Sequence, residues 1–348
     1  MNTIGTLLRC TTWGESHGVS IGAVLDGCPA GLEIQHTDIE KELERDIPDI
    51  ALGIPRREPN DFRILSGVYN GITVGTPICI EIPNRQQRSS DYDGIKHCYR
   101  PGHAEHTYHK RYGVYNSTGG RASGRVSISF LAAGVFSKKL LSGVGIGFES
   151  KLEELAGIRC RNGKDLDEAR KKCMEIGGNG DSTGGIVSLK IMGVPAGVGT
   201  PVFGKLNSLI MYALSSIGGV KGVECGMGFE AARMTGLEHN DGYLTDGSGI
   251  KLESNNCGGT LGGISTGTDL YFRLAVKPTP SIQLPQKSVD WMKEQQEEIK
   301  LNGRFDINFA PRVGPLAEAL ASLVLADQMM ISGYISPSKA SGGSKGGI

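Results

Sequence analysis

Three histidines lie three residues apart in one polar segment, 100-RPGHAEHTYHKR-111, with an arginine at each end. Histidine can bind a metal, transfer a proton near neutral pH, or pair with an anion when it is protonated. On a helix, residues three apart differ by about 60°, so His103 and His109 would point about 120° apart. Such ligands converge poorly on one ion, and a histidine pair four apart is missing. No metal is therefore expected, and His106 and His109 are typical of a solvated helix.

A second histidine is held between glycines in 14-GESHG-18, directly before a stretch that is typical of a strand. A histidine near a strand end can act as an acid or a base, because its ordinary pKa lies close to neutral pH. The plainer interpretation is a histidine that caps a turn. The segment alone leaves both interpretations of His17 open.

Several glycine-rich segments suit the binding of a phosphate group. The first, 119-GGRASGR-125, precedes a predicted helix, and both helix-start N–H groups and guanidinium forks bind anions. It lacks the Gly-Lys-Ser/Thr ending of a Walker loop. The second, 258-GGTLGGISTG-267 with 277-KPTPS-281, predicts either a loop under a flat or anionic ligand or a plain hairpin. With 303-GRFD-306 and 56-RREPND-61, these segments suit a phosphorylated substrate and a flat, phosphorylated cofactor.

The elements that must position these segments are strands and helices mixed along the chain. Apolar patterns predict strands near Val19–Leu25, Pro77–Ile82, Gly185–Met192, Val220–Gly226 and Asp269–Val276. Helices are predicted from a capping box at Thr37 through Glu44, over Phe203–Ile217 after Thr200-Pro201, over Leu316–Met330 after Gly314-Pro315, over Gly124–Leu141 and over Lys164–Ile176. Regular strand–helix alternation is missing, so the pattern predicts an α+β fold rather than a parallel array.

The composition of the 348-residue chain gives no sign of a nucleic-acid or membrane partner. Lys plus Arg and Asp plus Glu number 37 each, and no window approaches the roughly 18 consecutive apolar residues of a membrane helix. The N-terminus lacks signal-peptide features, and the 8 cysteines are scattered without a Cys-x-x-Cys pair. We expect a cytoplasmic protein with reduced thiols, one domain over 1–340, and a flexible glycine-rich tail over 341–348.

A set of segments in this chain resembles the chorismate synthase family, in the family's order and near its spacing. They are 13-WGESHGVSIGAVLDGCPAG-31, 63-RILSGVYNGITVGTPI-78, 99-YRPGHAEHTY-108, 119-GGRASGR-125, 220-VKGVE-224, 261-LGGISTG-267, 277-KPT-279 and 303-GRFD-306. The resemblance covers nearly the whole chain. It implies a single-domain βαβ sandwich of largely antiparallel sheets around helices, which is usually a homotetramer.

The resemblance also implies a carbon–oxygen lyase. Chorismate synthases remove phosphate from 5-enolpyruvylshikimate 3-phosphate (EPSP) by a 1,4-anti elimination, which gives chorismate at the end of the shikimate pathway to aromatic amino acids. They require reduced FMN without net redox change, because the flavin lends an electron as phosphate leaves and then recovers it. A separate flavin reductase is expected to supply the reduced flavin, with NADPH as ultimate donor. The alternatives are an FMN-binding homologue with lost or altered EPSP turnover and a flavin reductase that itself uses NADPH.

Carried over by position, the resemblance gives each candidate residue a role. His17 is implied to protonate the reduced flavin ring, His103 to protonate the departing phosphate, and Asp306 to assist proton transfer at the flavin nitrogen. The implied FMN-binding residues are Arg121, Ala122, Ser123, Gly218, Gly219, Gly262, Lys277, Pro278, Thr279, Pro280, Ser281 and Arg304. The implied substrate-binding residues are Arg45, Arg56, Arg57, Arg100 and Arg125.

The chain departs from the family mainly after the first predicted helix, in 44-ERDIPDIALGIPRREP-59. Family members usually carry an arginine-rich motif there, whereas Asp46, Ile47 and Leu52 stand at or near those arginines. Each lost guanidinium contact to a phosphate could cost about 1.5–3 kcal/mol, so substrate affinity is the property most affected. Arg45, Arg56 and Arg57 are the candidates to compensate. Other departures are Phe305 for His, Ile307-Asn308 for Pro-Cys, Glu105 for Asp, Asn256 for His and Pro280 for Ser.

Overall fold

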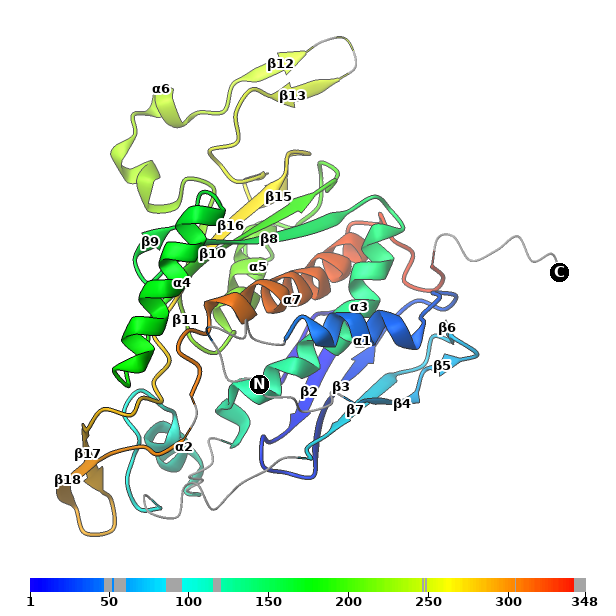
Figure 1. Cartoon of the computed structure of the whole chain (residues 1–348). Helices are drawn as coiled ribbons and strands as arrows, with labels where there is room; N and C mark the ends of the chain where they lie inside the picture. The colour runs from blue at the N-terminus through cyan, green and yellow to red at the C-terminus, as the bar shows by residue number, and fades with distance from the viewer. Residues whose placement is uncertain are drawn as a thin grey trace.

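The computed structural model describes residues 1–46, 52, 61–85, 96–114, 120–245, 247, 249–303 and 305–340. In this part of the chain, two antiparallel sheets enclose a layer of helices (Figure 1), which confirms the predicted α+β sandwich. The first sheet has the order β1 (Thr3–Ile4), β2 (Arg9–Gly14), β3 (Ser20–Asp26), β7 (Ile78–Pro83), β4 (Arg63–Ser66). The second has the order β11 (Val220–Cys225), β16 (Leu270–Val276), β10 (Gly185–Met192), β8 (Gly147–Leu155), β9 (Ile158–Arg159).

Two long helices form the centre of the helical layer. Helix α3 (Ile128–Ser142) packs on β3, and α7 (Ala310–Ile331) packs on β8 and β10, so the pair joins the two sheets. The other helices of the described residues are α1 (His36–Glu44), α2 (Glu105–Tyr112), α4 (Gly163–Gly178), α5 (Leu206–Ser215) and α6 (Gly236–His239), with short 3-10 turns at Gly120–Ala122, Gly124–Ser127 and Gly228–Arg233.

Four small hairpins extend from this sandwich within the described residues. They are β5 (Val68–Tyr69) with β6 (Ile72–Thr73), β12 (Tyr243–Thr245) with β13 (Ile250–Leu252), β14 (Thr260–Leu261) with β15 (Ile264–Ser265), and β17 (Gln286–Asp290) with β18 (Gln295–Ile299). Figure 1 shows the β12–β13 and β17–β18 hairpins projecting from opposite ends of the molecule.

Helix α7 is apolar on nearly every side, which is typical of a helix buried in a core. It has the length and composition of a membrane span, contrary to the expectation that no window comes close, but 89% of its apolar window is buried inside the protein. Small residues let α3 approach it. A Cβ atom on Gly134 would lie 2.6 Å from that of Ala319, and the Ser137 and Ser322 hydroxyls are 2.6 Å apart.

The predicted strands match the observed strands to within a residue or two, but four helix starts differ. Helix α3 begins at Ile128 rather than at the predicted Gly124, because Gly124–Ser127 forms a 3-10 turn. The capping carboxylate of α1 is Asp38, which accepts from the Gln35 N–H at 2.8 Å, and the predicted box at Thr37 is wrong. Residues 200–204 form a tight loop, so α5 begins later than predicted, at Leu206. Helix α7 begins earlier than predicted, at Ala310, and Pro315 lies inside it.

Candidate active site

The turn that follows β2 carries His17 and meets the segment that carries Arg121. Gly14 ends β2 with φ +86°, and a Cβ atom there would lie 2.3 Å from the Ser20 carbonyl oxygen, so only glycine fits. The Ser16 N–H donates to the Gly120 carbonyl at 3.2 Å. The Arg121 guanidinium donates to the Thr12 and Gly14 carbonyls at 2.8 and 3.3 Å. Within the turn, the Ser16 hydroxyl lies 3.0 Å from Nδ1 of His17.

His103 lies beside the 277-KPTPS-281 segment. Its Nε2 is 3.0 Å from the Ser281 hydroxyl, and its Nδ1 is 3.0 Å from the Pro101 carbonyl oxygen. A carbonyl only accepts, so Nδ1 carries the proton of the neutral ring and Nε2 has the free lone pair. The Lys277 amine donates to the Gly102 carbonyl at 2.7 Å. Nε2 is therefore the atom that can gain and lose a proton.

Further hydrogen bonds place the Gly218-Gly219 pair and Thr279 close to Lys277. The Lys277 N–H donates to the Gly219 carbonyl at 2.9 Å, and the Ser182 hydroxyl donates to the Thr279 carbonyl at 2.6 Å. The Thr279 hydroxyl oxygen is itself buried, without a hydrogen-bond partner among the described residues. An ammonium group with a buried, unsatisfied hydroxyl is suited to the polar groups of a phosphorylated ligand.

Burial and nearby cations set the electrostatics around His103. Burial lowers the pKa of His103 to about 4, with further lowering from Arg100 and Lys277 that outweighs the hydrogen bond to Pro101. Burial and the neighbouring Lys221 also lower the pKa of Lys277. The Arg100 side chain is buried and donates from Nε to Glu105 at 2.6 Å. This environment favours an anion, because an anion would offset the accumulated positive charge.

A cavity of about 740 Å³ lies between the two histidine segments. Ala104, next to His103, lines it from one side, and Glu15 and Arg121 line it from the other. Its wall also includes Trp13, Glu105, Tyr108 and Tyr112, which the sequence did not point to as site residues. Glu105 had been noted only as a departure from the family, and the other three residues had no signal beyond lying next to residues that were singled out.

Asp306 lies just before α7 and is held by neighbouring contacts. Its Oδ2 is 3.4 Å from Nη1 of Arg312. Two residues on, the Asn308 side chain donates to the Thr183 hydroxyl and the Gly184 carbonyl, both at 2.8 Å. Gly184 is adjacent to the Lys277–Pro278 backbone. The segment around Asp306 therefore lies near the segment around Lys277, with Gly184 in contact with both.

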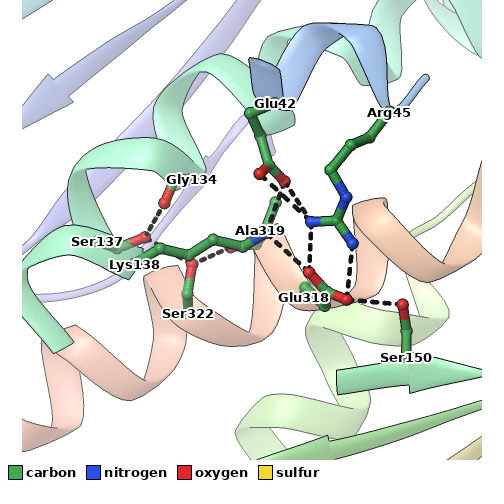
Figure 2. Close-up of polar contacts among 9 residues, drawn as sticks. All are labelled: Glu42, Arg45, Gly134, Ser137, Lys138, Ser150, Glu318, Ala319 and Ser322. Carbon is green, nitrogen blue, oxygen red and sulfur yellow. Dashed lines mark hydrogen bonds and ion pairs between the residues drawn. The ribbon is translucent and has the colours of Figure 1, made fainter. Parts of the chain in front are cut away.

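Other predicted residues lie elsewhere or have other partners. The Arg45 guanidinium binds Glu318 and Glu42 in a network between helices (Figure 2). Gly262 lies in the β14–β15 turn, whose contacts go to α5, well away from α2 in Figure 1. Arg125 is buried in the 3-10 turn before α3, which follows Ala122 and Ser123. Arg56, Arg57, Arg304 and the tail 341–348 lie outside the described residues.

The three histidines of the opening segment have separate surroundings. His106 packs its ring edge-on against Tyr99, with 5.0 Å between ring centres. Nδ1 of His109 forms a hydrogen bond of 2.8 Å with the Tyr99 hydroxyl, and the ring packs against Trp291. His103 is the one that contacts the Lys277–Ser281 segment, through its hydrogen bond to Ser281.

Comparison with known proteins identifies the family. The family model described as chorismate synthase matches residues 8–330. The chain belongs to the chorismate synthase family. It is 45% identical to the chorismate synthase of Methanosarcina mazei, with 97% of this chain and 98% of that relative covered. It is 43% identical to the chorismate synthase of Methanocaldococcus jannaschii, with the same coverage of 97% and 98%.

A solved structure agrees with this assignment. A crystal structure of chorismate synthase superposes with a TM-score of 0.74 at 27% identity, and covers 94% of this chain and 93% of its own. Membership in the chorismate synthase family, predicted from the motifs, is thereby confirmed. The roles of single residues remain predictions, and the contacts above show which of those residues lie together.

Proposed function

We propose that this protein is a chorismate synthase that eliminates phosphate from EPSP and uses reduced FMN. The observation that carries the proposal is the environment of His103. Its Nε2 lies beside Ser281, and Arg100 and Lys277 place positive charge around it. A phosphate leaves more readily when its oxygens are protonated or paired with cations, and this site offers both.

The residues present fit FMN. The Lys277 ammonium, the Arg121 guanidinium and the buried Thr279 hydroxyl are donors suited to a flavin phosphate and its ring oxygens. Bound reduced FMN would supply an electron that is returned within the same turnover. The protein's own part is to hold substrate and flavin together and to move protons at His17, His103 and Asp306.

His103 must become protonated before it can act as an acid. Its pKa of about 4 keeps it neutral near pH 7 in this structure. A substrate phosphate carries negative charge, which offsets Arg100 and Lys277 and favours the protonated ring. We therefore propose that substrate binding itself charges Nε2, which then donates to the leaving phosphate.

The test of the activity is anaerobic incubation with EPSP and photoreduced FMN, followed by measurement of chorismate and free phosphate. Formation of both products supports the proposal. If neither appears while flavin still binds, the chain is an FMN-binding homologue without EPSP turnover. NADPH oxidation by the protein alone would instead support a reductase activity.

The histidine roles are tested with single substitutions. His17→Ala and His103→Ala are each expected to slow turnover by about 10²–10⁴-fold, because each removes a proton-transfer group. The matched control is His106→Ala, since His106 packs against Tyr99 and has no proposed role in the chemistry. Near wild-type turnover in either of the first two variants would contradict its role.

We further propose that the enzyme is a cytoplasmic homotetramer that receives reduced flavin from a separate reductase. This proposal follows from membership in the family, to which the sequence resemblance assigns a homotetramer and an external supply of reduced flavin. Light scattering coupled to size-exclusion chromatography measures the assembly. A monomer at micromolar concentration would contradict the tetramer.

A further inference from the structure

Arg312 lies in the first turn of α7, between carboxylates from two distant parts of the chain. Its Nε and Nη2 donate to the two oxygens of Asp46 at 3.1 and 2.7 Å, while Nη1 lies 3.4 Å from Oδ2 of Asp306. The forked pair with Asp46 fixes the plane of the guanidinium. The guanidinium carbon also lies 5.1 Å from the centre of the Phe309 ring. Nη1 is therefore directed at Asp306.

These three side chains are shielded from water. Exposed fractions are 15% for Arg312, 6% for Asp46 and 18% for Asp306. Burial lowers the pKa of Arg312, but Asp46 and Asp306 outweigh this effect and raise it above the ordinary value. The guanidinium is therefore a permanent cation, and shielding keeps salt from weakening its ion pairs.

A second attachment joins the same two segments. The Leu52 carbonyl accepts from the N–H groups of Ile307 and Asn308 at 3.0 and 3.2 Å. Leu52 is buried, with 1% of its surface exposed. Residues 46 and 52 thus both contact the segment that begins with Asp306. The Asp46–Arg312 pair is therefore part of a wider attachment.

We propose that Arg312, fixed in place by Asp46, is a positioning residue for the Asp306 carboxylate. The inference rests on the proposed role of Asp306 in proton transfer at the flavin. Proton transfer requires heavy atoms about 2.6–3.2 Å apart, and a misplacement of about 1 Å can cost about 10²-fold in rate. Asp46 stands at or near a position where the family usually has arginine. In this chain that departure provides the anchor for Arg312.

The first experiment measures steady-state kinetics of Arg312→Lys and Asp46→Asn. Lysine keeps the charge but cannot form the fork, and asparagine keeps the size of Asp46 but not its charge. Each variant is expected to lower kcat by about 10–100-fold and to leave KM for EPSP near the wild-type value. The matched control is Arg273→Lys, whose guanidinium also bridges two carboxylates, Glu153 and Glu224, at 2.9 and 3.1 Å. Its kcat should stay unchanged.

The decisive measurement adds Arg312→Lys to Asp306→Asn. If Arg312 acts through Asp306, the double variant has the same kcat as Asp306→Asn alone. Equal fold-losses from Arg312→Lys in both backgrounds would overturn the proposal, because they would show an independent role. A crystal structure of ligand-free Asp46→Asn gives a readout without turnover. There the Asp306 carboxylate is expected to have moved, and an unmoved carboxylate contradicts the proposal.

The outcomes also separate this inference from the proposed function. If Asp306→Asn turns over at the wild-type rate, the role of Asp306 fails and the positioning role fails with it, although chorismate formation stands. If Asp306→Asn is slow but Arg312→Lys is as fast as wild type, only the positioning role is overturned.

Discussion

At the scale of single residues, the His103 ring is held at both nitrogens, by the Pro101 carbonyl and the Ser281 hydroxyl at 3.0 Å each. Both partners suit the neutral ring, and burial together with Arg100 lowers its pKa to about 4. The folded protein therefore resists protonation at His103, whereas the unfolded chain takes up a proton near the ordinary pKa of 6.5. This difference makes folding stability depend on pH.

We expect the free energy of unfolding of the wild-type protein to fall as the pH is lowered from about 6.5 toward 4. In that range only the unfolded chain takes up a proton at His103. The loss would reach about 3 kcal/mol at pH 4. Urea unfolding of wild type and His103→Gln at pH 7, 5.5 and 4.5 measures it, since the substitution removes this part of the pH dependence. Parallel pH profiles for the two proteins would contradict the expectation.

At the scale of elements, a buried charge network joins α1, α3, α7 and β8 (Figure 2). Glu318 of α7 binds Arg45 at 2.6 Å and Lys138 at 2.9 Å, and accepts from the Ser150 hydroxyl at 2.7 Å. Burial raises the pKa of Glu318, but Arg45, Lys138 and Ser150 outweigh it and lower the pKa. Glu318 therefore stays ionised and holds the end of α1 against the central helices.

Glu318→Ala is expected to lower the free energy of unfolding by about 1.5–3 kcal/mol, because it removes the buried carboxylate that Arg45 and Lys138 share and leaves them only Glu42. Urea unfolding at pH 7 measures the change. The control is Glu230→Ala, which removes an ion pair to Arg233 whose side chains are 68% and 59% exposed. That pair should contribute less than about 1 kcal/mol, so equal losses from both substitutions would contradict the assignment.

The contact between α3 and α7 depends on the absence of a side chain at Gly134. Gly134→Ala would place a Cβ atom 2.6 Å from that of Ala319 and 2.9 Å from its Cα, so one helix must shift. We expect a loss of about 1–3 kcal/mol in unfolding free energy. Gly178→Ala in α4 is the matched control, since nothing lies within 4 Å of its added atom. A loss in the control as large as at Gly134 would argue against a packing origin.

At the scale of the whole molecule, both sheets share one hydrophobic core. The buried residues of β3 and β7 belong to the same cluster as those of β10 and β16, through α3 and α7. Neither sheet can expose its inner face without exposing the helices that the other sheet covers. The predicted single domain over 1–340 is consistent with such a shared core.

We therefore expect one cooperative unfolding transition. Far-UV circular dichroism follows both sheets, and the fluorescence of a Trp291→Phe variant follows Trp13 in β2 of the first sheet alone. The two midpoints in urea should coincide, because the core is continuous. Separate midpoints would show that the sheets unfold independently.

Local patterns in the sequence were sufficient for β10, β11 and β16 of the second sheet, whereas β8 and β9 were not predicted. In β16, Leu270, Phe272 and Leu274 alternate with less buried residues, and this period follows from the pleat of a strand. The starts of α5 and α7 were not predictable, because tertiary contacts decide them. The Leu206 N–H binds the Gly263 carbonyl at 2.9 Å. The Ala310 N–H binds the side-chain oxygen of Asn308 at 2.8 Å, and that side chain is held by the distant Thr183 and Gly184.

For the candidate site, the motifs alone identified the family and the segments that carry His17, His103 and Asp306. These motifs are local, since each depends on residue types at short spacing. Only the tertiary structure placed His103 against Ser281, which is 178 residues away, and joined Arg312 to Asp46 across 266 residues. Such pairs depend on how the sheets and helices pack, and no short-range pattern records them. The sequence therefore determined what chemistry is present, and the packing decided which groups act on one another.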